Sequence, residues 1–310
     1  MSENVITSYK GFDKNMQCRG FQYEVGKEYE MDGEINCCNR GFHACKSPME
    51  VWDYYDMINS RYAEVEQSGK IDEEENSTKV CSSRIKIKAE LKLADIINIG
   101  VEWLKDITSP SKVKADGALN DNGDRRKQIG SSGDYAKIGS SGYYAQIGSS
   151  GDSAKIGSSG YYAQIGSSGY YAKIGSSGDY AKIGSSGDSA KIGSSGDYAK
   201  IGSSGDYAKI GSSGYYAKIG SSGDYAQIGS SGDSAKINST GEDSVIMCAG
   251  NSSIAKAKVG SWITLTEWKW SDKKKRDVPV CVKTEYVDGE NIKADTWYQL
   301  KNGKFIEVNE

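Results

Sequence analysis

The residue types best suited to chemistry lie in the first third of the chain, around its single histidine. His43 is part of CCNRGFHAC (residues 37–45), and Cys81 lies farther along the same region. Zinc prefers thiolate and imidazole ligands, but the paired Cys-x-x-Cys spacing typical of structural zinc sites is missing. We therefore predict no metal site and no cofactor. The sequence leaves open whether a few residues bind a metal or are free thiols: Cys18, Cys37, Cys38, His43 and Cys45.

Two further patterns could support catalysis. Cys45 and His43 would share one face of a strand, as a nucleophile and its base do, but no third partner is recognisable. An opening strand YKGF, the segment GFHAC, a helix and then Glu64-Val65-Glu66 together resemble ADP-ribosyltransferases. That resemblance implies NAD chemistry at the glutamates, with Lys10 or Arg19 as the first-strand residue. The Ser-Thr-Ser strand of that family is absent, so we assign no catalytic residue and keep an enzyme as the alternative.

These residues require a folded domain, which we place at 1–117 and predict to be α+β. Residues 9–12 and 83–89 show strand patterns. Residues 47–55 are expected to form a helix that Ser47 opens with Pro48 at its first position. A second helix is expected over 91–107.

The centre of the chain is a repeat of nine residues. Isoleucine recurs at every ninth position from Ile129 to Ile237, which gives twelve complete units of the form Ile-Gly-Ser-Ser-Gly-(Asp/Tyr)-(Tyr/Ser)-Ala-(Lys/Gln). This glycine content would cost a helix about 1 kcal/mol per residue, so a stacked β-structure remains. We predict one short strand and one corner per unit, with isoleucine and alanine inside, lysine outside and glycine supplying positive φ at the corner. Two units per coil would give about six coils at roughly 4.8 Å per layer.

Tyrosine dominates the variable positions of this array, which contains thirteen of the 21 tyrosines in the chain. Stacked rings would stabilise neighbouring coils, or they would form an aromatic contact surface. For the second alternative, the candidate binding residues come from the four units that contain two adjacent tyrosines. They are Tyr143, Tyr144, Tyr161, Tyr162, Tyr170, Tyr171, Tyr215 and Tyr216.

The complete fold is therefore expected to be mainly β, with a β-solenoid (β-roll) between two other domains. We place the array with its degenerate caps at 118–260, and a small antiparallel β module at 261–310, where VDGEN and KNGKF show tight-hairpin signals.

Composition excludes several classes of function. The array has nine lysines against eight aspartates, and the whole chain has a net charge of −3. No region therefore has the excess of basic residues that a nucleic-acid-binding surface needs. No apolar run is long enough for a membrane helix, and MSENVITSYK lacks the features of a signal peptide. Seven cysteines without an export signal fit reduced thiols. We expect a cytoplasmic protein without nucleic-acid or membrane partners, and leave homo-oligomerisation open.

Three resemblances bear on function. Gly175, Asp179 and Ala181 match the nonapeptide calcium β-roll, which implies a calcium-stabilised module, although Ile174 and Ser177 replace glycines of that pattern. The phrase GDSAKIGSSG resembles the β-roll heads of trimeric autotransporter adhesins. The phrases YKGFDKNMQCRGFQYEVGKEYE, GFHACKSPMEVWDYY and GSWITLTE resemble an uncharacterised family of phage and prophage proteins with this domain order.

The main functional prediction follows from the repeat, because catalysis rarely needs identical side chains on every strand. We expect a non-enzymatic phage or prophage protein in the bacterial cytoplasm, whose rigid solenoid binds a host protein, for example to inhibit a defence system. The alternatives are an enzyme in the N-terminal domain and a structural module of a virion.

Overall fold

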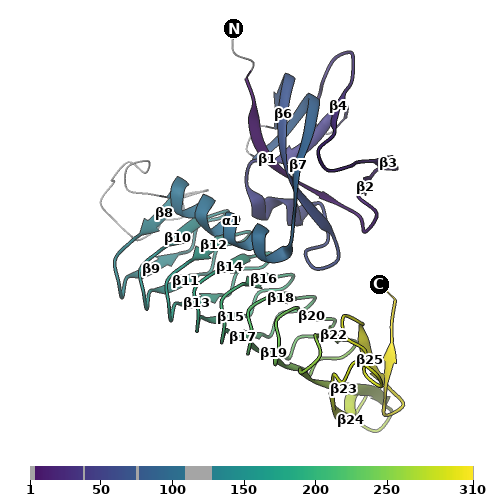
Figure 1. Ribbon diagram of the computed structural model, residues 1–310. Helices are drawn as coiled ribbons and strands as arrows, with labels where there is room; N and C mark the ends of the chain where they lie inside the picture. Colours follow the sequence, from purple (N-terminus) through teal and green to yellow (C-terminus); the bar gives the residue numbers. More distant parts are fainter. Residues whose placement is uncertain (1–3, 38, 75–76, 109–127, 310) are drawn as a thin grey trace. The chain divides into compact units, whose positions relative to one another are not determined.

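A computed structural model describes residues 4–37, 39–74, 77–108 and 128–309 (Figure 1). The chain divides into two compact units, Met1–Trp103 and Leu104–Glu310, which are described separately below. None of the helices among the described residues has the length and apolar character needed to cross a membrane. Most of the degenerate cap predicted before the first repeat, from residue 118 on, falls outside the described residues.

The N-terminal unit is built on a five-stranded sheet with the order β4-β7-β5-β1-β6, in which β6 also pairs with β7. The ring β1-β6-β7-β5 is therefore closed, and β4 extends it from β7. A two-stranded hairpin, a 3-10 helix and an α-helix accompany the sheet. The bounds are β1 Ile6–Phe12, β2 Gln17–Cys18, β3 Phe21–Gln22, β4 Glu28–Glu30, β5 Phe42–Cys45, η1 Pro48–Asp53, β6 Arg61–Glu73, β7 Lys79–Leu91 and α1 Leu93–Ile107.

Alternation explains why the long strands form. In β7, Ile85 and Ile87 are fully buried, whereas Lys86 and Lys88 between and after them face outward. The strands predicted at 9–12 and 83–89 and the helix predicted at 91–107 are confirmed. The helix predicted at 47–55 is a shorter 3-10 helix, and the Ser47 side chain makes no capping hydrogen bond.

The second unit is a β-solenoid of about eight turns over residues 128–265, which confirms the predicted architecture (Figure 1). Each coil has two strands, which belong alternately to a ten-stranded and a nine-stranded sheet. The strands of the repeat array are parallel within each sheet and pair two units apart, so that Ile147 lies opposite Ile165. There are more than the six predicted coils because the degenerate segment after Ile237 continues both sheets.

The strands of the solenoid are four residues long and nearly identical up to β20, after which their lengths and sequences vary. The ten-stranded sheet contains β8 Gln128–Ser131, β10 Gln146–Ser149, β12 Gln164–Ser167, β14 Lys182–Ser185, β16 Lys200–Ser203, β18 Lys218–Ser221, β20 Lys236–Ser239 and β22 Ile254–Lys256. The nine-stranded sheet contains β9 Lys137–Ser140, β11 Lys155–Ser158, β13 Lys173–Ser176, β15 Lys191–Ser194, β17 Lys209–Ser212, β19 Gln227–Ser230, β21 Val245–Cys248 and β23 Trp262–Ser271.

Isoleucine and alanine fill the interior, as predicted. Ile183 and Ala181 are fully buried, and isoleucines from Ile129 to Ile237 form one continuous core. The first serine of each Gly-Ser-Ser-Gly also points inward; Ser185 is fully buried. Packing rather than hydrogen bonding holds these serines, since most of their hydroxyls have no partner in the described part of the chain.

The corner geometry differs from the prediction. The residue with positive φ is not a glycine but the seventh residue of each unit; Tyr180 and Ser189 both have a φ of 56°. Glycine at the fifth position has a different purpose. A Cβ on Gly178 would collide with the carbonyl oxygen of Gly160 in the preceding coil, so only glycine allows the coils to approach closely here.

The C-terminal strands extend both sheets of the solenoid. β24 Arg276–Tyr286 pairs antiparallel with β23, and β25 Tyr298–Lys301 pairs with β22 and with β26 Lys304–Glu307. The last parallel strands are thereby covered, as the exposed end of a solenoid requires.

Candidate functional site

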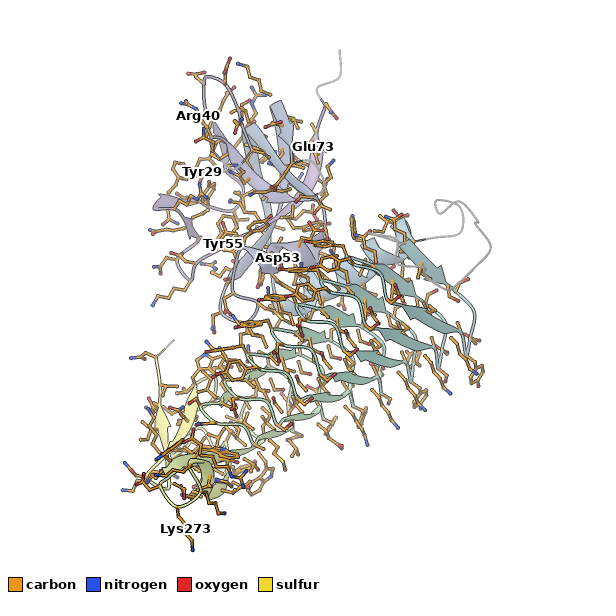
Figure 2. The ribbon with its side chains drawn as sticks, turned by 180° about the vertical axis from the view of Figure 1, so that it is seen from behind. Tyr29, Arg40, Asp53, Tyr55, Glu73 and Lys273 are labelled. Carbon is orange, nitrogen blue, oxygen red and sulfur yellow. The ribbon has the colours of Figure 1, made fainter. Side chains whose placement is uncertain are left out.

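Two surfaces of the solenoid and one cavity of the N-terminal unit are candidates for function. Side chains project from the solenoid coils in regular rows (Figure 2). Because each coil has two corners, the tyrosines of the array form two separate rows, one along each edge.

The first row, which we call the stacked edge, follows each strand of the nine-stranded sheet. Its rings lie face to face, with centroids 4.9 Å apart between Tyr162 and Tyr180 and again between Tyr180 and Tyr198. The stack continues to Tyr144 at one end and Tyr216 at the other. Since these rings cover one another's faces, only their rims and hydroxyls are available to a partner.

The second row, the open edge, follows each strand of the ten-stranded sheet. Ser153 and Ser189 interrupt it, so Tyr171 lies between two serines. On this edge Tyr207 and Tyr225 stack, with centroids 5.0 Å apart. Tyr171 is 62% exposed and Tyr135 is 76% exposed, and neither of these two rings contacts another ring among the described residues. The faces of these tyrosines are therefore free, as an aromatic contact surface requires.

The eight predicted binding residues consequently do not form one patch. Six lie on the stacked edge, whereas Tyr170 and Tyr171 lie on the open edge. Tyr143 stacks on Tyr161, but the pair Tyr215 and Tyr216 lies four coils away, which is about 19 Å at roughly 4.8 Å per layer.

A third feature is the outer face of the nine-stranded sheet. Five lysines project from it, one per coil, and none forms an ion pair or a hydrogen bond within the described residues. Beside them the glycines of the same strands leave open space, for a Cβ on Gly157, Gly175 or Gly193 would meet nothing within 4 Å. The result is a shallow groove of about 880 Å³ with a glycine floor. We call this the lysine face: Lys137, Lys155, Lys173, Lys191 and Lys209.

The lysine face could have been found in the sequence at a period of eighteen. At that period every coil from Lys137 to Lys209 contributes lysine to one sheet, while the other sheet starts with Gln128, Gln146 and Gln164. The nine-residue period hides this difference because it superimposes the two sheets.

The aspartates of the array stabilise the backbone. All eight accept a hydrogen bond from the backbone N–H of the residue one coil later; for Asp197 and Tyr215 the distance is 2.8 Å. The same bond joins Asp179 to the N–H of Asp197. One carboxylate oxygen of each aspartate is thus engaged, which leaves an incomplete oxygen set for calcium.

The N-terminal unit contains a cavity of about 760 Å³ between β1, the β2–β3 hairpin, β4, β5 and η1. Figure 2 labels Tyr29 and Tyr55, two of its aromatic lining residues. Lys10 lies buried in its wall, where its Nζ donates a hydrogen bond of 2.8 Å to the carbonyl oxygen of His43 and lies 3.6 Å from Cys18 Sγ. Burial lowers the pKa of Lys10 and raises the pKa of Tyr55.

The cavity is positive and lacks a free carboxylate base. Burial, together with Lys10, Lys79 and Arg19, lowers the pKa of His43 to about 4. The lining carboxylates, Glu28 and Glu30, both pair with Arg84, at 3.4 Å and 2.9 Å. This environment suits an anionic ligand better than general base catalysis.

The Glu-x-Glu motif lies elsewhere. Glu64 and Glu66 are on β6 and do not line the cavity, and Glu66 Oε1 accepts a hydrogen bond of 2.7 Å from Lys88 Nζ. Lys10 and Arg19 do line it. The structure therefore does not bring together the residues that the ADP-ribosyltransferase resemblance would require.

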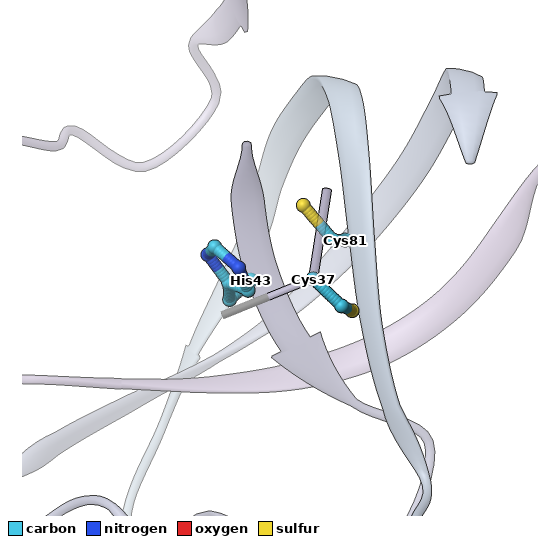
Figure 3. Close-up of side chains that lie close together, drawn as sticks. All are labelled: Cys37, His43 and Cys81. Carbon is cyan, nitrogen blue, oxygen red and sulfur yellow. The ribbon is translucent and has the colours of Figure 1, made fainter. Parts of the chain in front are cut away.

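The cysteines of the N-terminal unit fall into two groups. Cys18 lies at the cavity, 2.8 Å from the hydroxyl of Tyr55, and Cys45 is buried opposite Tyr9. Cys37, His43 and Cys81 instead lie close together (Figure 3). Cys38 falls outside the described residues.

Comparisons with known proteins give one match, which covers part of the N-terminal unit. Residues 6–99 match the family model described as a domain of unknown function (DUF7666). No curated protein matches the chain. No solved structure matches it either.

Proposed function

We propose that the chain is a non-enzymatic interaction protein whose solenoid binds a protein partner through the open edge and the lysine face. The observation that carries the proposal is the row of five exposed lysines without counter-ions beside a floor of glycines. Such a row keeps its full electrostatic attraction for an anionic partner, since no internal carboxylate neutralises it.

The open edge is continuous with the lysine face. Tyr171 is separated from Lys173 by the buried Ala172, and Tyr135 from Lys137 by the half-buried Ala136. Free tyrosine faces provide large, rigid contact area of the kind enriched in protein interfaces, and the lysines beside them add electrostatic attraction for an acidic partner. The stacked edge, in contrast, stabilises the coils.

The proposed partner is an acidic segment of a bacterial protein rather than nucleic acid. Nine lysines against eight aspartates give the array almost no net charge, which is too little for a phosphate backbone, whereas a short acidic segment needs only the row of lysines. We place the protein in the bacterial cytoplasm as a phage or prophage product that interferes with a host system, which rests on the resemblance of its flanking sequences.

The experiment compares variants that copy units already present in the chain. Tyr170→Asp with Tyr171→Ser reproduces Asp152 and Ser153 and should fold normally. Tyr215→Asp with Tyr216→Ser makes the same change on the stacked edge. We expect affinity capture from the bacterial host to recover a stoichiometric partner with wild type and with the stacked-edge variant, but not with the open-edge variant.

Charge reversal provides the second arm. Lys155→Glu, Lys173→Glu and Lys191→Glu together should abolish capture, and capture by the wild type should weaken as salt is raised. Undiminished capture by both the open-edge and the lysine variants would refute the proposal. Consumption of NAD or a modified host protein that depends on Glu66 would move the function to the N-terminal unit.

A further inference from the structure

Three neighbouring strands of the N-terminal unit place a row of potential ligands on one face of the sheet. His43 of β5 is paired with Cys81 of β7, and Cys81 is paired in turn with Asp72 of β6. Side chains of directly paired residues project from the same face, so these three lie side by side across the strands.

A turn brings a fourth residue to this row. The bridge between Asn36 and Arg40 closes the turn, and the backbone N–H of Cys37 donates a hydrogen bond of 2.7 Å to Asp72 Oδ2. Gly41 then leads into β5 with a φ of 135°, and a Cβ on it would overlap Cys81 Sγ. The turn and β7 can approach this closely only because residue 41 is glycine.

We propose that Cys37, His43 and Cys81 bind one zinc ion. Their ligand atoms lie within 4.8 Å of one another (Figure 3). Ligands at about 2.0–2.3 Å from a common centre are separated by somewhat less than this, so only a small movement is needed. Two thiolates and one neutral imidazole balance the charge of Zn²⁺, and this donor set is one that zinc prefers.

The charges around the three residues differ from one side to the other: the Asp72 carboxylate lies at Cys37, and the cationic Lys10, Lys79 and Arg19 lie on the His43 side. The two thiols and the Asp72 carboxylate are crowded into one partly buried region, where their negative forms would repel one another without a positive ion between them. Asp72 holds the backbone of Cys37 and therefore acts as a positioning residue. Three protein ligands leave one coordination position for water or a further ligand, and His43 also lines the cavity.

The test is the metal content of the purified full-length chain. After incubation with zinc and gel filtration, elemental analysis should find about one zinc per chain. Replacement by cobalt should give the visible bands of tetrahedral cobalt and a cysteine-to-cobalt charge-transfer band. Asp72→Asn should weaken zinc binding about 10–100-fold, as loss of an outer-sphere partner does.

Matched cysteine variants decide the outcome. Cys37→Ser should remove both the bound zinc and the cobalt charge-transfer band, whereas Cys45→Ser should keep both. Cys81 is fully buried and its variant could unfold, so Cys37, which is partly exposed, is the decisive position. Absence of stoichiometric zinc in the wild type, or full zinc binding by folded Cys37→Ser, would overturn the proposal.

Discussion

The seventh residue of each repeat adopts a backbone conformation that its own side chain disfavours. Left-handed φ costs a non-glycine residue about 1–2 kcal/mol, yet tyrosine occupies this position in nine units. On the stacked edge, Tyr180 offsets that cost by stacking against Tyr162 and Tyr198. On the open edge, Tyr171 has no ring neighbour within the described residues, so stacking cannot account for its presence there.

This difference predicts unequal effects of one substitution. Tyr180→Ser should lower the free energy of unfolding by about 1.5–4.5 kcal/mol, since three aromatic pairs, with Tyr161, Tyr162 and Tyr198, are lost at about 0.5–1.5 kcal/mol each. Tyr171→Ser should change it by less than about 0.5 kcal/mol. Urea unfolding followed by circular dichroism measures both. Equal losses in the two variants would show that stacking does not stabilise the coils.

The fifth and second residues of the unit are both glycine, but only one of them needs to be. Gly178→Ala should shift the urea midpoint strongly downward, because the new Cβ would collide with the Gly160 carbonyl oxygen. Gly175→Ala places its Cβ in open space and should leave the midpoint nearly unchanged. If both variants were equally stable, the close approach of the coils would be wrong.

At the scale of the element, the unit of construction is the pair of repeats. Deleting the eighteen residues 182–199 removes one strand from each sheet and leaves every later strand in its own sheet. Deleting only 182–190 moves every later strand into the opposite sheet, so the C-terminal strands would no longer meet their partners.

We therefore expect the eighteen-residue deletion to unfold at nearly the wild-type temperature and the nine-residue deletion to be much less stable or insoluble. Thermal unfolding monitored by circular dichroism compares them. A nine-residue deletion as stable as the eighteen-residue one would contradict the two-strand coil.

The aspartate rows lead to a prediction about calcium. One oxygen of each aspartate already accepts a backbone N–H, as between Asp152 and Tyr170, so millimolar calcium should raise the melting temperature very little. A calcium chelator should likewise have no effect. An increase of many degrees on adding calcium would identify the solenoid as a calcium-stabilised module after all.

Much of the solenoid was predictable because its signal is local. The nine-residue isoleucine period located the strands, and the impossibility of burying one face of a short strand alone required stacked coils. The choice of Tyr180 over Gly178 for positive φ was not predictable, because packing between coils decides it. The pairing of Cys81 with His43 was not predictable either, since it depends on strand register across 38 residues.

At the scale of the whole molecule, the net charge does not show how the charged residues are arranged. The chain has 39 basic and 42 acidic residues, which suggests no preference for a charged partner. In the solenoid, however, the lysines of one sheet lie in a single file, while the aspartates occupy the corners. Charge separation between faces, rather than total charge, is what a partner would encounter.

The candidate sites are divided between the two units. The cavity and the Cys37–His43–Cys81 cluster are confined to the N-terminal unit, whereas the lysine face and both tyrosine rows belong to the second. Substitutions in one unit should accordingly leave the proposed activity of the other intact, and each proposal can fail without the other.

The stacked edge is also a line of identical chromophores. From Tyr144 to Tyr216 the ring centroids are about 5 Å apart, and no tryptophan lies between residues 104 and 261. Excitation energy absorbed by one ring should therefore pass along the row before it is emitted. Because neighbouring ring planes are tilted by only 4–22°, this transfer should depolarise the fluorescence of the row very little, whereas a row with irregularly oriented rings would lose its polarisation.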